Sequence, residues 1–302
     1  MVVTLIERFR ERLPVTARTP VISLGEGSTP LLRAPRLSER LGVEIWVKWE
    51  GANPTGSFKD RGMTVAVSKA LEDGAEAVVC ASTGNTAASA AAYAARAGLR
   101  ALIVHSAGAV AVGKVAQASA VGAELIEIEG GFASALDHAL ELAARPGHVL
   151  VNSLNPDRLE GQKTAAFEIL EELGRAPDVL ALPYGGGGNT CAYARGFAEE
   201  GARPRLLVCE AAERAVTAAS AIRIAEPVHR REAEEHVAES GGSVLRLPDE
   251  EILAARRQLG ELEGIFCEAA SAAGIAGVAR ERPTGKVVCV VTGHGLKEAA
   301  SP

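Results

Sequence analysis

Residues 53–62 read Asn-Pro-Thr-Gly-Ser-Phe-Lys-Asp-Arg-Gly, and this stretch decides how the surrounding chain is interpreted. Its single lysine, Lys59, follows a turn in which Pro54 and Gly56 favour an irregular backbone. Ser57 is a suitable N-cap for the helix that we expect over Met63–Leu71. N–H groups at a helix start favour an anion, so Lys59 could help to bind an anionic ligand such as a phosphate. The alternative is that it is an ordinary solvated surface lysine.

Strand and helix patterns alternate along the chain on both sides of this turn. We expect strands over 44–49, 77–81, 101–104, 125–129, 149–152, 179–182, 205–209 and 286–291. Helices are expected over 87–97, 112–122, 133–143, 159–173, 231–240 and 249–263, and partly over 31–41. This alternation is typical of the α/β class, with open, mostly parallel, twisted sheets flanked by helices.

The chain is expected to form two such sheets, each in its own domain. The theme of alternating strands and helices starts again after Arg145-Pro146-Gly147, where we place the boundary between the sheets. We therefore expect a large α/β domain of residues 1–50 plus 146–302 and a small α/β domain of residues 51–145.

Three polar, glycine-containing loops each follow the end of an apolar strand. They are STGNT at 82–86, YGGGGNT at 184–190 and TGHG at 292–295. In open α/β sheets ligands bind at the carboxyl edge of the strands, although each loop alone could be a plain turn. The four consecutive glycines, Gly185–Gly188, let the main chain approach a phosphate closely.

The glycine loop excludes two common nucleotide sites. It lacks the following Gly-Lys-Ser/Thr of a nucleoside-triphosphate loop and the GxGxxG pattern of a dinucleotide site. A small phosphorylated cofactor fits better. Lys59 then acquires a role, because an amine can form a Schiff base with an aldehyde.

A second polar group lies in one segment and one helix start. Asn152, Ser153, Asn155, Arg158 and Lys163 crowd together in the sequence, and Lys114 begins an expected helix. Cations with amide and hydroxyl donors suit a second phosphate. The alternative is that the basic residues form surface ion pairs with neighbouring acids.

Composition excludes several classes of protein. The 302 residues carry a net charge of −6 and show no basic stripe, which argues against nucleic-acid binding. No apolar stretch is long enough for a membrane span, and the charged N-terminus does not resemble a signal peptide. The five cysteines are odd in number, scattered and without CxxC spacing. Cys80, Cys209 and Cys289 lie in apolar strand-like runs, which indicates buried thiols in a reducing, cytoplasmic environment and not disulfides or metal ligands.

Several motifs in a consistent order resemble one enzyme family. They are GEGSTPL (25–31), GSFKDRG (56–62), STGNTAAS (82–89), VNSLNPDRLEGQKT (151–164), the glycine loop, GIFCEAASAA (264–273) and TGHGLK (292–297). Together they resemble the threonine synthases, which are pyridoxal-phosphate enzymes of the tryptophan-synthase β-subunit fold type. The resemblance implies pyridoxal 5'-phosphate as cofactor, bound in the cleft between two sheets (fold type II), and a homodimer.

The resemblance also implies roles for individual residues. Lys59 would form the Schiff base and act as the catalytic proton shuttle. The cofactor would further contact Asn85, Gly185, Gly186, Gly187, Gly188, Asn189 and Thr292, with Thr292 at the pyridine nitrogen. Ligands of the substrate phosphate would be Lys114, Asn152, Ser153 and Arg158, and Ser82, Thr83 and Thr86 would lie near the substrate carboxylate. We expect His294 to be a turn residue and not a catalytic base.

The implied activity converts O-phospho-L-homoserine and water to L-threonine and phosphate by γ-elimination and β-addition. The chain departs from the family pattern where Gly186 and Gly187 replace Asn and Ala, where Ala269 replaces a proline, and in a short, charged segment at 211–236. A serine/threonine dehydratase-like lyase is the alternative, because its glycine loop is closer to this one. A third reading is a binding protein that keeps the fold without catalysis.

Overall fold

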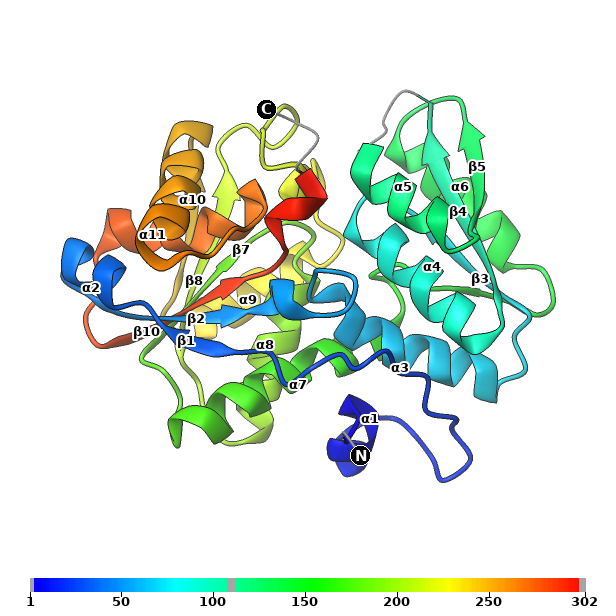
Figure 1. Ribbon diagram of the computed structural model, residues 1–302, viewed down its shortest axis with the longest axis horizontal. Helices are drawn as coiled ribbons and strands as arrows, with labels where there is room; N and C mark the ends of the chain where they lie inside the picture. Colours follow the sequence, from blue (N-terminus) through cyan, green and yellow to red (C-terminus); the bar gives the residue numbers. More distant parts are fainter. Residues whose placement is uncertain (1–2, 108–111, 299–302) are drawn as a thin grey trace. The chain divides into compact units, whose positions relative to one another are not determined.

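The chain forms two compact units, each built on its own sheet (Figure 1). The computed structural model describes residues 3–107 and 112–298, without the side chains of residues 112 and 113. The first unit comprises residues 1–27, 53–162 and 297–302, and the second comprises 28–52 and 163–296. This division differs from the expected domains at several boundaries; near residue 146 the reason is that the strand at 148–150 pairs with the sheet of the first unit.

The sheet of the first unit is entirely parallel, with the order β5-β4-β3-β6. Its strands are β3 (Ala77–Ala81), β4 (Arg100–Ser106), β5 (Glu124–Ile128) and β6 (His148–Leu150). The helices are α1 (Leu5–Arg8), α3 (Lys59–Glu72), α4 (Asn85–Ala97), α5 (Val112–Ala120) and α6 (Phe132–Ala143), with a 3-10 turn at Arg10–Arg12.

Alternate residues of the central strands fill two apolar cores in this unit. Val78 and Cys80 of β3 face the core formed with α3 and α4, whereas Val79 and Ala81 face α6. Because both faces of the sheet are covered at β3, this strand is apolar throughout, with the sequence AVVCA. The carboxyl ends of β3 and β4 therefore emerge at one edge of the sheet, followed by polar loops.

The sheet of the second unit has the order β1-β2-β10-β7-β8-β9 and is parallel except for the pair β1 and β2. Its strands are β1 (Leu31–Arg33), β2 (Glu44–Trp49), β7 (Val179–Pro183), β8 (Arg205–Ala211), β9 (Ser243–Leu247) and β10 (Lys286–Val291). Its helices are α2 (Pro35–Leu41), α8 (Gly188–Glu199), α9 (Arg230–Glu239), α10 (Asp249–Glu263) and α11 (Ala273–Glu281). Four 3-10 turns complete the described elements, at Glu50–Ala52, Ser220–Ile222, Ala269–Ala272 and Gly295–Glu298.

Helices α2, α10 and α11 cover one face of this sheet and share one apolar core with it (Figure 1). Leu37 of α2, Ile252 of α10 and Ile275 of α11 all belong to this core. Helix α7 (Pro156–Leu173) begins in the first unit and continues into the second. The expected α/β class with two mostly parallel sheets is confirmed, although strands β1 and β9 were not expected.

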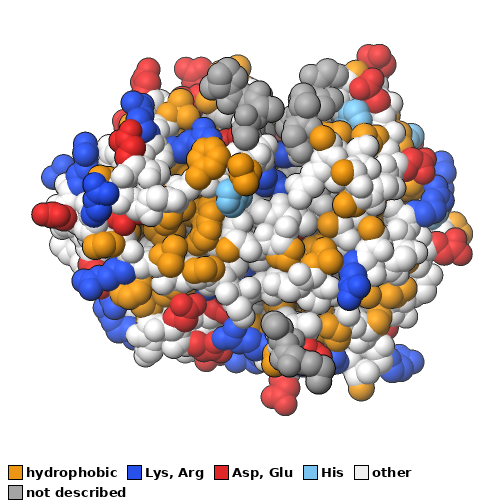
Figure 2. Space-filling model, viewed as in Figure 1, with side chains coloured by type: hydrophobic (Ala, Val, Ile, Leu, Met, Phe, Trp, Pro, Cys, Tyr) orange, Lys and Arg blue, Asp and Glu red, His pale blue; other side chains and the backbone are white. Residues whose placement is uncertain are grey.

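The visible surface carries charges of both signs. Acidic and basic side chains are interspersed on the face shown in Figure 2. Among the described residues, no helix combines the length and apolar composition that crossing a bilayer requires. All five cysteines are free and buried.

Helices α3 and α7 approach each other so closely that glycine is required between them. A Cβ atom on Gly161 of α7 would lie 2.0 Å from the carbonyl oxygen of Arg61 in α3. A Cβ atom on Gly62 would lie 2.5 Å from the carbonyl oxygen of Arg158. This backbone contact sets where α3, and therefore Lys59 at its first residue, lies in the first unit.

We expect Gly161→Ala to destabilise the chain by at least about 2 kcal/mol, because the new methyl group forces the two helix backbones apart. The matched control is Gly260→Ala in α10, where a Cβ atom would meet nothing closer than 3.9 Å. That control should stabilise the chain by roughly 0.5–1 kcal/mol. Urea unfolding measures both, and equal effects of the two substitutions would contradict the close contact.

Candidate functional site

A buried carboxylate, not a serine cap, holds the turn that carries Lys59. Helix α3 begins at Lys59, its N-cap is Phe58, and no side chain caps it, so the predicted Ser57 cap is wrong. The carboxylate of Asp60 instead accepts hydrogen bonds from the Thr55 N–H at 2.7 Å and the Thr55 hydroxyl at 2.6 Å. These bonds join residue 55 to residue 60 and so fix the turn that leads into Lys59.

Asp60 also connects the lysine turn to the next helix. Its Oδ1 accepts a hydrogen bond of 2.6 Å from the hydroxyl of Ser89 in α4. Asp60 is fully buried, and this burial raises its pKa to about 6 against the opposing effect of its hydrogen bonds. Because α4 begins at Asn85, Lys59 and Asn85 are the first residues of two helices joined by this carboxylate.

The STGNT loop lies where strand β3 leads into α4. Ser82 and Thr83 follow β3, and Asn85 and Thr86 are the first two residues of α4. The N–H of Gly84 donates to the hydroxyl of Ser82 at 3.0 Å. The structure therefore places four of the predicted site residues at the carboxyl edge of the sheet.

Ser82 and Thr83 also line a cavity of about 290 Å³ in the first unit. The cavity lies between the ends of β3 and β4 and the start of α6. Its other lining residues are Val104, His105, Ser106, Ala107, Gly130, Gly131, Phe132 and Ala135.

The side-chain amide of Asn152 is hydrogen-bonded to the backbone of strand β3. Its Oδ1 accepts from the N–H of Ala81 at 2.8 Å, and its Nδ2 donates to the carbonyl of Ala81 at 2.9 Å. Asn152 therefore fastens the end of β3 to the segment after β6. Ser153 follows directly, half-buried.

Arg158 is a buried cation, and two of its donor atoms make no hydrogen bond to the described residues. Its side chain is fully buried, and its Nη1 donates to the carbonyl of Val151 at 2.7 Å. Nε and Nη2 are buried without a hydrogen-bond partner among the described residues. Burial lowers the pKa of this guanidinium to about 10, so it stays charged at neutral pH and favours an anion.

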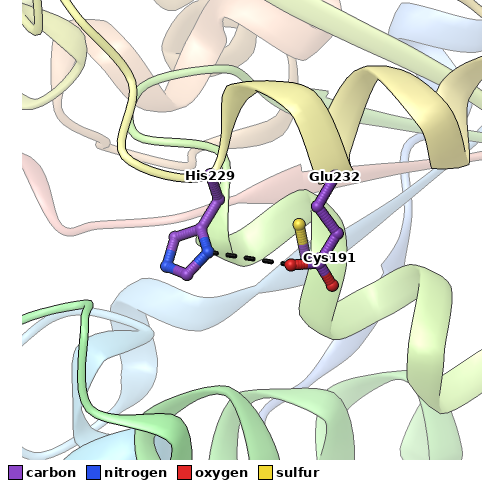
Figure 3. Close-up of side chains that lie close together, drawn as sticks. All are labelled: Cys191, His229 and Glu232. Carbon is purple, nitrogen blue, oxygen red and sulfur yellow. Dashed lines mark ion pairs between the residues drawn. The ribbon is translucent and has the colours of Figure 1, made fainter.

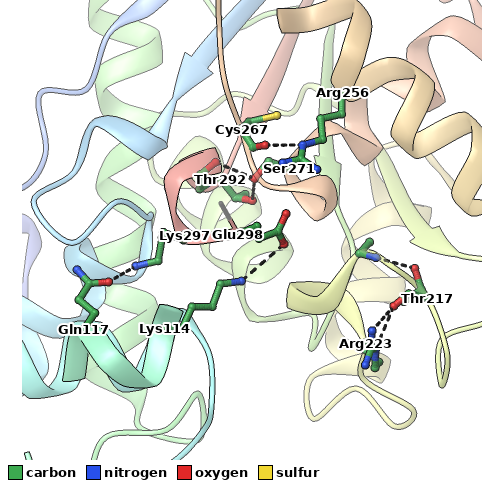
Figure 4. A network of polar contacts seen from close by, with 12 residues as sticks. Lys114, Gln117, Thr217, Arg223, Arg256, Cys267, Ser271, Thr292, Lys297 and Glu298 are labelled. Carbon is green, nitrogen blue, oxygen red and sulfur yellow. Dashed lines mark hydrogen bonds and ion pairs between the residues drawn. The ribbon is translucent and has the colours of Figure 1, made fainter. Parts of the chain in front are cut away.

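The two lysines of this group, Lys163 and Lys114, have different contacts. Lys163 forms an ion pair of 2.6 Å with Glu199, but the lysine is buried and its partner is distant in the sequence, so this is not the surface pair with a neighbouring acid that the alternative described. Lys114 in α5 is buried, with its Nζ 3.8 Å from Oε1 of Glu298 (Figure 4). Next to Glu298, Lys297 donates to Oε1 of Gln117 at 2.7 Å and to the carbonyl of Thr55. Sequence reasoning missed Lys297, although it ends the TGHGLK motif.

In the second unit, the glycine loop joins β7 to α8. Gly187 has a φ of +87°, and a Cβ atom there would lie 2.9 Å from the carbonyl oxygen of His229. Glycine is therefore required at 187. At Gly186 a Cβ atom would only touch Ile224 at 3.6 Å, so the geometry tolerates a side chain there.

The start of α8 presents polar atoms that lack a partner. Nδ2 of Asn189 and Oγ1 of Thr190 are buried without a hydrogen-bond partner among the described residues. The loop itself is held from outside, because Arg214 donates to the carbonyl of Gly185 at 3.2 Å and is paired with Glu210. The donors and the helix start suit a phosphate group.

Thr292 follows β10 in the second unit and is linked to Ser271 (Figure 4). The two hydroxyl oxygens lie 2.9 Å apart, and the Ser271 oxygen accepts from the N–H of Gly293 at 2.8 Å. His294 accepts through Nδ1 from the N–H of Leu296 at 3.1 Å, and its ring centroid lies 5.4 Å from that of Trp49. These contacts agree with the expected role of His294 as a turn residue.

Comparison with protein families and curated proteins gives consistent results. A family model described as pyridoxal-phosphate dependent enzyme matches residues 22–293. A threonine synthase of Halalkalibacterium halodurans is 49% identical, covering 97% of this chain and 89% of that protein. Threonine synthases of Synechocystis sp. and Methanocaldococcus jannaschii are 50% and 44% identical, covering 97% and 96% of this chain and 83% and 80% of theirs.

Solved structures share the fold at lower identity. A threonine deaminase from T.th. superposes with a TM-score of 0.77 at 26% identity, covering 96% of both chains. A fungal L-serine ammonia-lyase from Rhizomucor miehei has a TM-score of 0.79 at 23% identity, covering 89% of this chain and 94% of that one.

The raised pKa of Asp60 predicts a pH-dependent stability. Between its ordinary value of 3.8 and about 6, the folded chain retains a proton that the unfolded chain has released. Raising the pH through this window should therefore lower the free energy of unfolding, by an amount on the order of 3 kcal/mol. Above about pH 6 the loss should level off.

Asp60→Asn provides the control, because it has no proton to lose in this range. The difference in unfolding free energy between wild type and Asp60→Asn, measured in urea at several pH values, should fall as the pH rises from about 4 to about 6. A difference that is constant across this window would show that Asp60 ionises normally.

Proposed function

Because the chain belongs to the family of pyridoxal-phosphate-dependent enzymes and, within it, to the threonine synthases, we propose that it converts O-phospho-L-homoserine and water to L-threonine and phosphate. The observation that supports this substrate most is the buried guanidinium of Arg158, whose Nε and Nη2 lack a protein partner among the described residues. A substrate phosphate would supply the missing charge and acceptors.

The residues present fit the cofactor. We assign its phosphate to Gly185–Gly188 and Asn189, where the close approach at Gly187 and the partnerless donors of Asn189 and Thr190 suit an anion. Asn85 is assigned to the ring hydroxyl and Thr292 to the ring nitrogen. When bound, pyridoxal phosphate withdraws electrons from the carbon next to the substrate amino group.

Lys59 is the residue that we assign to proton transfer. With pyridoxal phosphate bound, the Lys59 amine would hold the aldehyde group, and as a free amine it would take the proton from Cα of the substrate. The closed turn around Asp60 holds the base at the start of α3. Thr292, whose hydroxyl oxygen lies 2.9 Å from that of Ser271, would offer the ring nitrogen a neutral partner, whereas a carboxylate would favour its protonation.

The substrate is assigned to residues of the first unit. Arg158, Lys114 and Ser153 would bind its phosphate, and Ser82, Thr83 and Thr86 would bind its carboxylate. Asn152 contributes by holding the segment before Ser153, since its amide is bonded to Ala81. We further propose a cytoplasmic homodimer: the free thiols agree with a reducing compartment, and the dimer is carried over from the family.

Product analysis tests the proposed function. The protein with pyridoxal phosphate is incubated with O-phosphohomoserine or with threonine, and inorganic phosphate, threonine and keto acid are measured. We expect equal amounts of phosphate and threonine from the first substrate and little keto acid from the second. Keto acid from threonine without phosphate release from O-phosphohomoserine would instead support the dehydratase-like alternative.

Arg158→Gln should raise KM for O-phosphohomoserine by about tenfold to a hundredfold, because charged hydrogen bonds of roughly 1.5–3 kcal/mol are lost. Cofactor absorbance should be retained, since the assigned cofactor ligands are untouched. Arg175→Gln is the control, because Arg175 is exposed and pairs with Asp178 and the carbonyl of Ala176. An unchanged KM in a folded, cofactor-loaded Arg158→Gln enzyme would contradict the assignment.

A further inference from the structure

Three side chains with metal-binding atoms converge behind the glycine loop of the second unit (Figure 3). Cys191 lies in α8, His229 is the N-cap of α9, and Glu232 lies in the first turn of α9. One ligand atom from each side chain lies within 4.8 Å of the other two. Thiolate, imidazole and carboxylate are the ligand types that zinc takes in proteins.

Arg195 orients the carboxylate of this cluster. Its Nε donates to Oε1 of Glu232 at 3.0 Å, and its Nη2 donates to the same oxygen. The other oxygen, Oε2, lies 3.8 Å from Nδ1 of His229 (Figure 3). One carboxylate oxygen is thus held by a guanidinium while the other faces the imidazole, which is how an outer partner orients a metal ligand.

A second imidazole lies beside the same carboxylate. Nε2 of His236 is 3.6 Å from Oε1 of Glu232 and is buried without a hydrogen-bond partner among the described residues. His229, Glu232 and His236 follow at spacings of three and four, which places them on one face of α9. His236 therefore lies beside the cluster on the same helix, although its ring atoms are not among the three ligand atoms that lie within 4.8 Å of one another.

The cluster is attached to the glycine loop through the main chain. The N–H of His229 donates to the carbonyl of Gly186 at 3.0 Å, and the N–H of Cys191 donates to the carbonyl of Gly187 at 3.1 Å. A cation bound to both side chains would therefore fasten the segment before α9 to α8, with the glycine loop between their backbones.

We propose that Cys191, His229 and Glu232 bind one divalent cation of the zinc class and that this ion rigidifies the glycine loop from behind. A borderline-soft ion is favoured, because Mg²⁺ and Ca²⁺ prefer six or more ligands that are mainly oxygen. The cysteine must lose its proton when the ion binds. The proposal is independent of the proposed function, since no substrate or cofactor atom takes part.

The test is titration of tag-free, chelator-treated holoenzyme with ZnCl₂ by calorimetry. We expect one Zn²⁺ per chain, at least tenfold weaker binding in Cys191→Ser and in His229→Gln, and a higher unfolding temperature of the wild type with Zn²⁺. Glu235→Gln is the matched control, because Glu235 lies on the same helix and pairs with Arg231 at the surface. This control should bind Zn²⁺ as the wild type does.

Absence of stoichiometric Zn²⁺ binding, or binding unaltered in both variants, would overturn the proposal. Should Cys191→Ser fail to fold, the wild type can be titrated with Co²⁺ instead. A thiolate-to-cobalt charge-transfer absorption is then expected if Cys191 is a ligand. Binding of Co²⁺ without that absorption would equally overturn the assignment, because Cys191 would then not be a ligand.

Discussion

The buried carboxylate of Asp60 is the constraint on which the first unit depends. It accepts from two groups of Thr55 and from the hydroxyl of Ser89, so one side chain closes the turn before α3 and connects α3 to α4. Burial of a carboxyl without a paired cation is unfavourable, as its raised pKa shows. Its hydrogen bonds offset part of this cost. The contact at Gly161 then fixes α3 against α7.

Polar groups without partners mark the two places where ligands are expected. Among the buried side-chain atoms without a hydrogen-bond partner in the described part of the chain, Nε and Nη2 of Arg158 lie in the first unit, and Nδ2 of Asn189 and Oγ1 of Thr190 lie in the second. Buried donors of this kind are rarely left unsatisfied, so each set indicates an anion. Other side chains hold the backbone next to both sets. Asn152 fastens β3 to the segment before Arg158, and Arg214 holds the carbonyl of Gly185.

Much of the fold could be predicted from the sequence, because buried parallel strands such as 77–81 and 286–291 are apolar, apart from Lys286 at the start of the second, and lead into glycine-containing loops. Strand β1 was missed because it has only three residues, and β9 because its alternation is short and mixed with charge. The motifs located the candidate residues, but they could not assign side-chain partners. Three findings depend on contacts between segments that are distant in the sequence. Asp60 holds the lysine turn through Ser89, Asn152 bonds to Ala81 of the sheet, and Lys163 pairs with Glu199.

The central claim is that the amine of Lys59, held at the start of α3, is the one that joins the cofactor. Borohydride reduction of the holoenzyme, followed by digestion and mass spectrometry, locates the attachment directly. The account predicts a single phosphopyridoxyl group on the peptide that contains Lys59. A group on Lys114 or Lys297, or no covalent group at all, would contradict it and would favour a protein that keeps the fold without the chemistry.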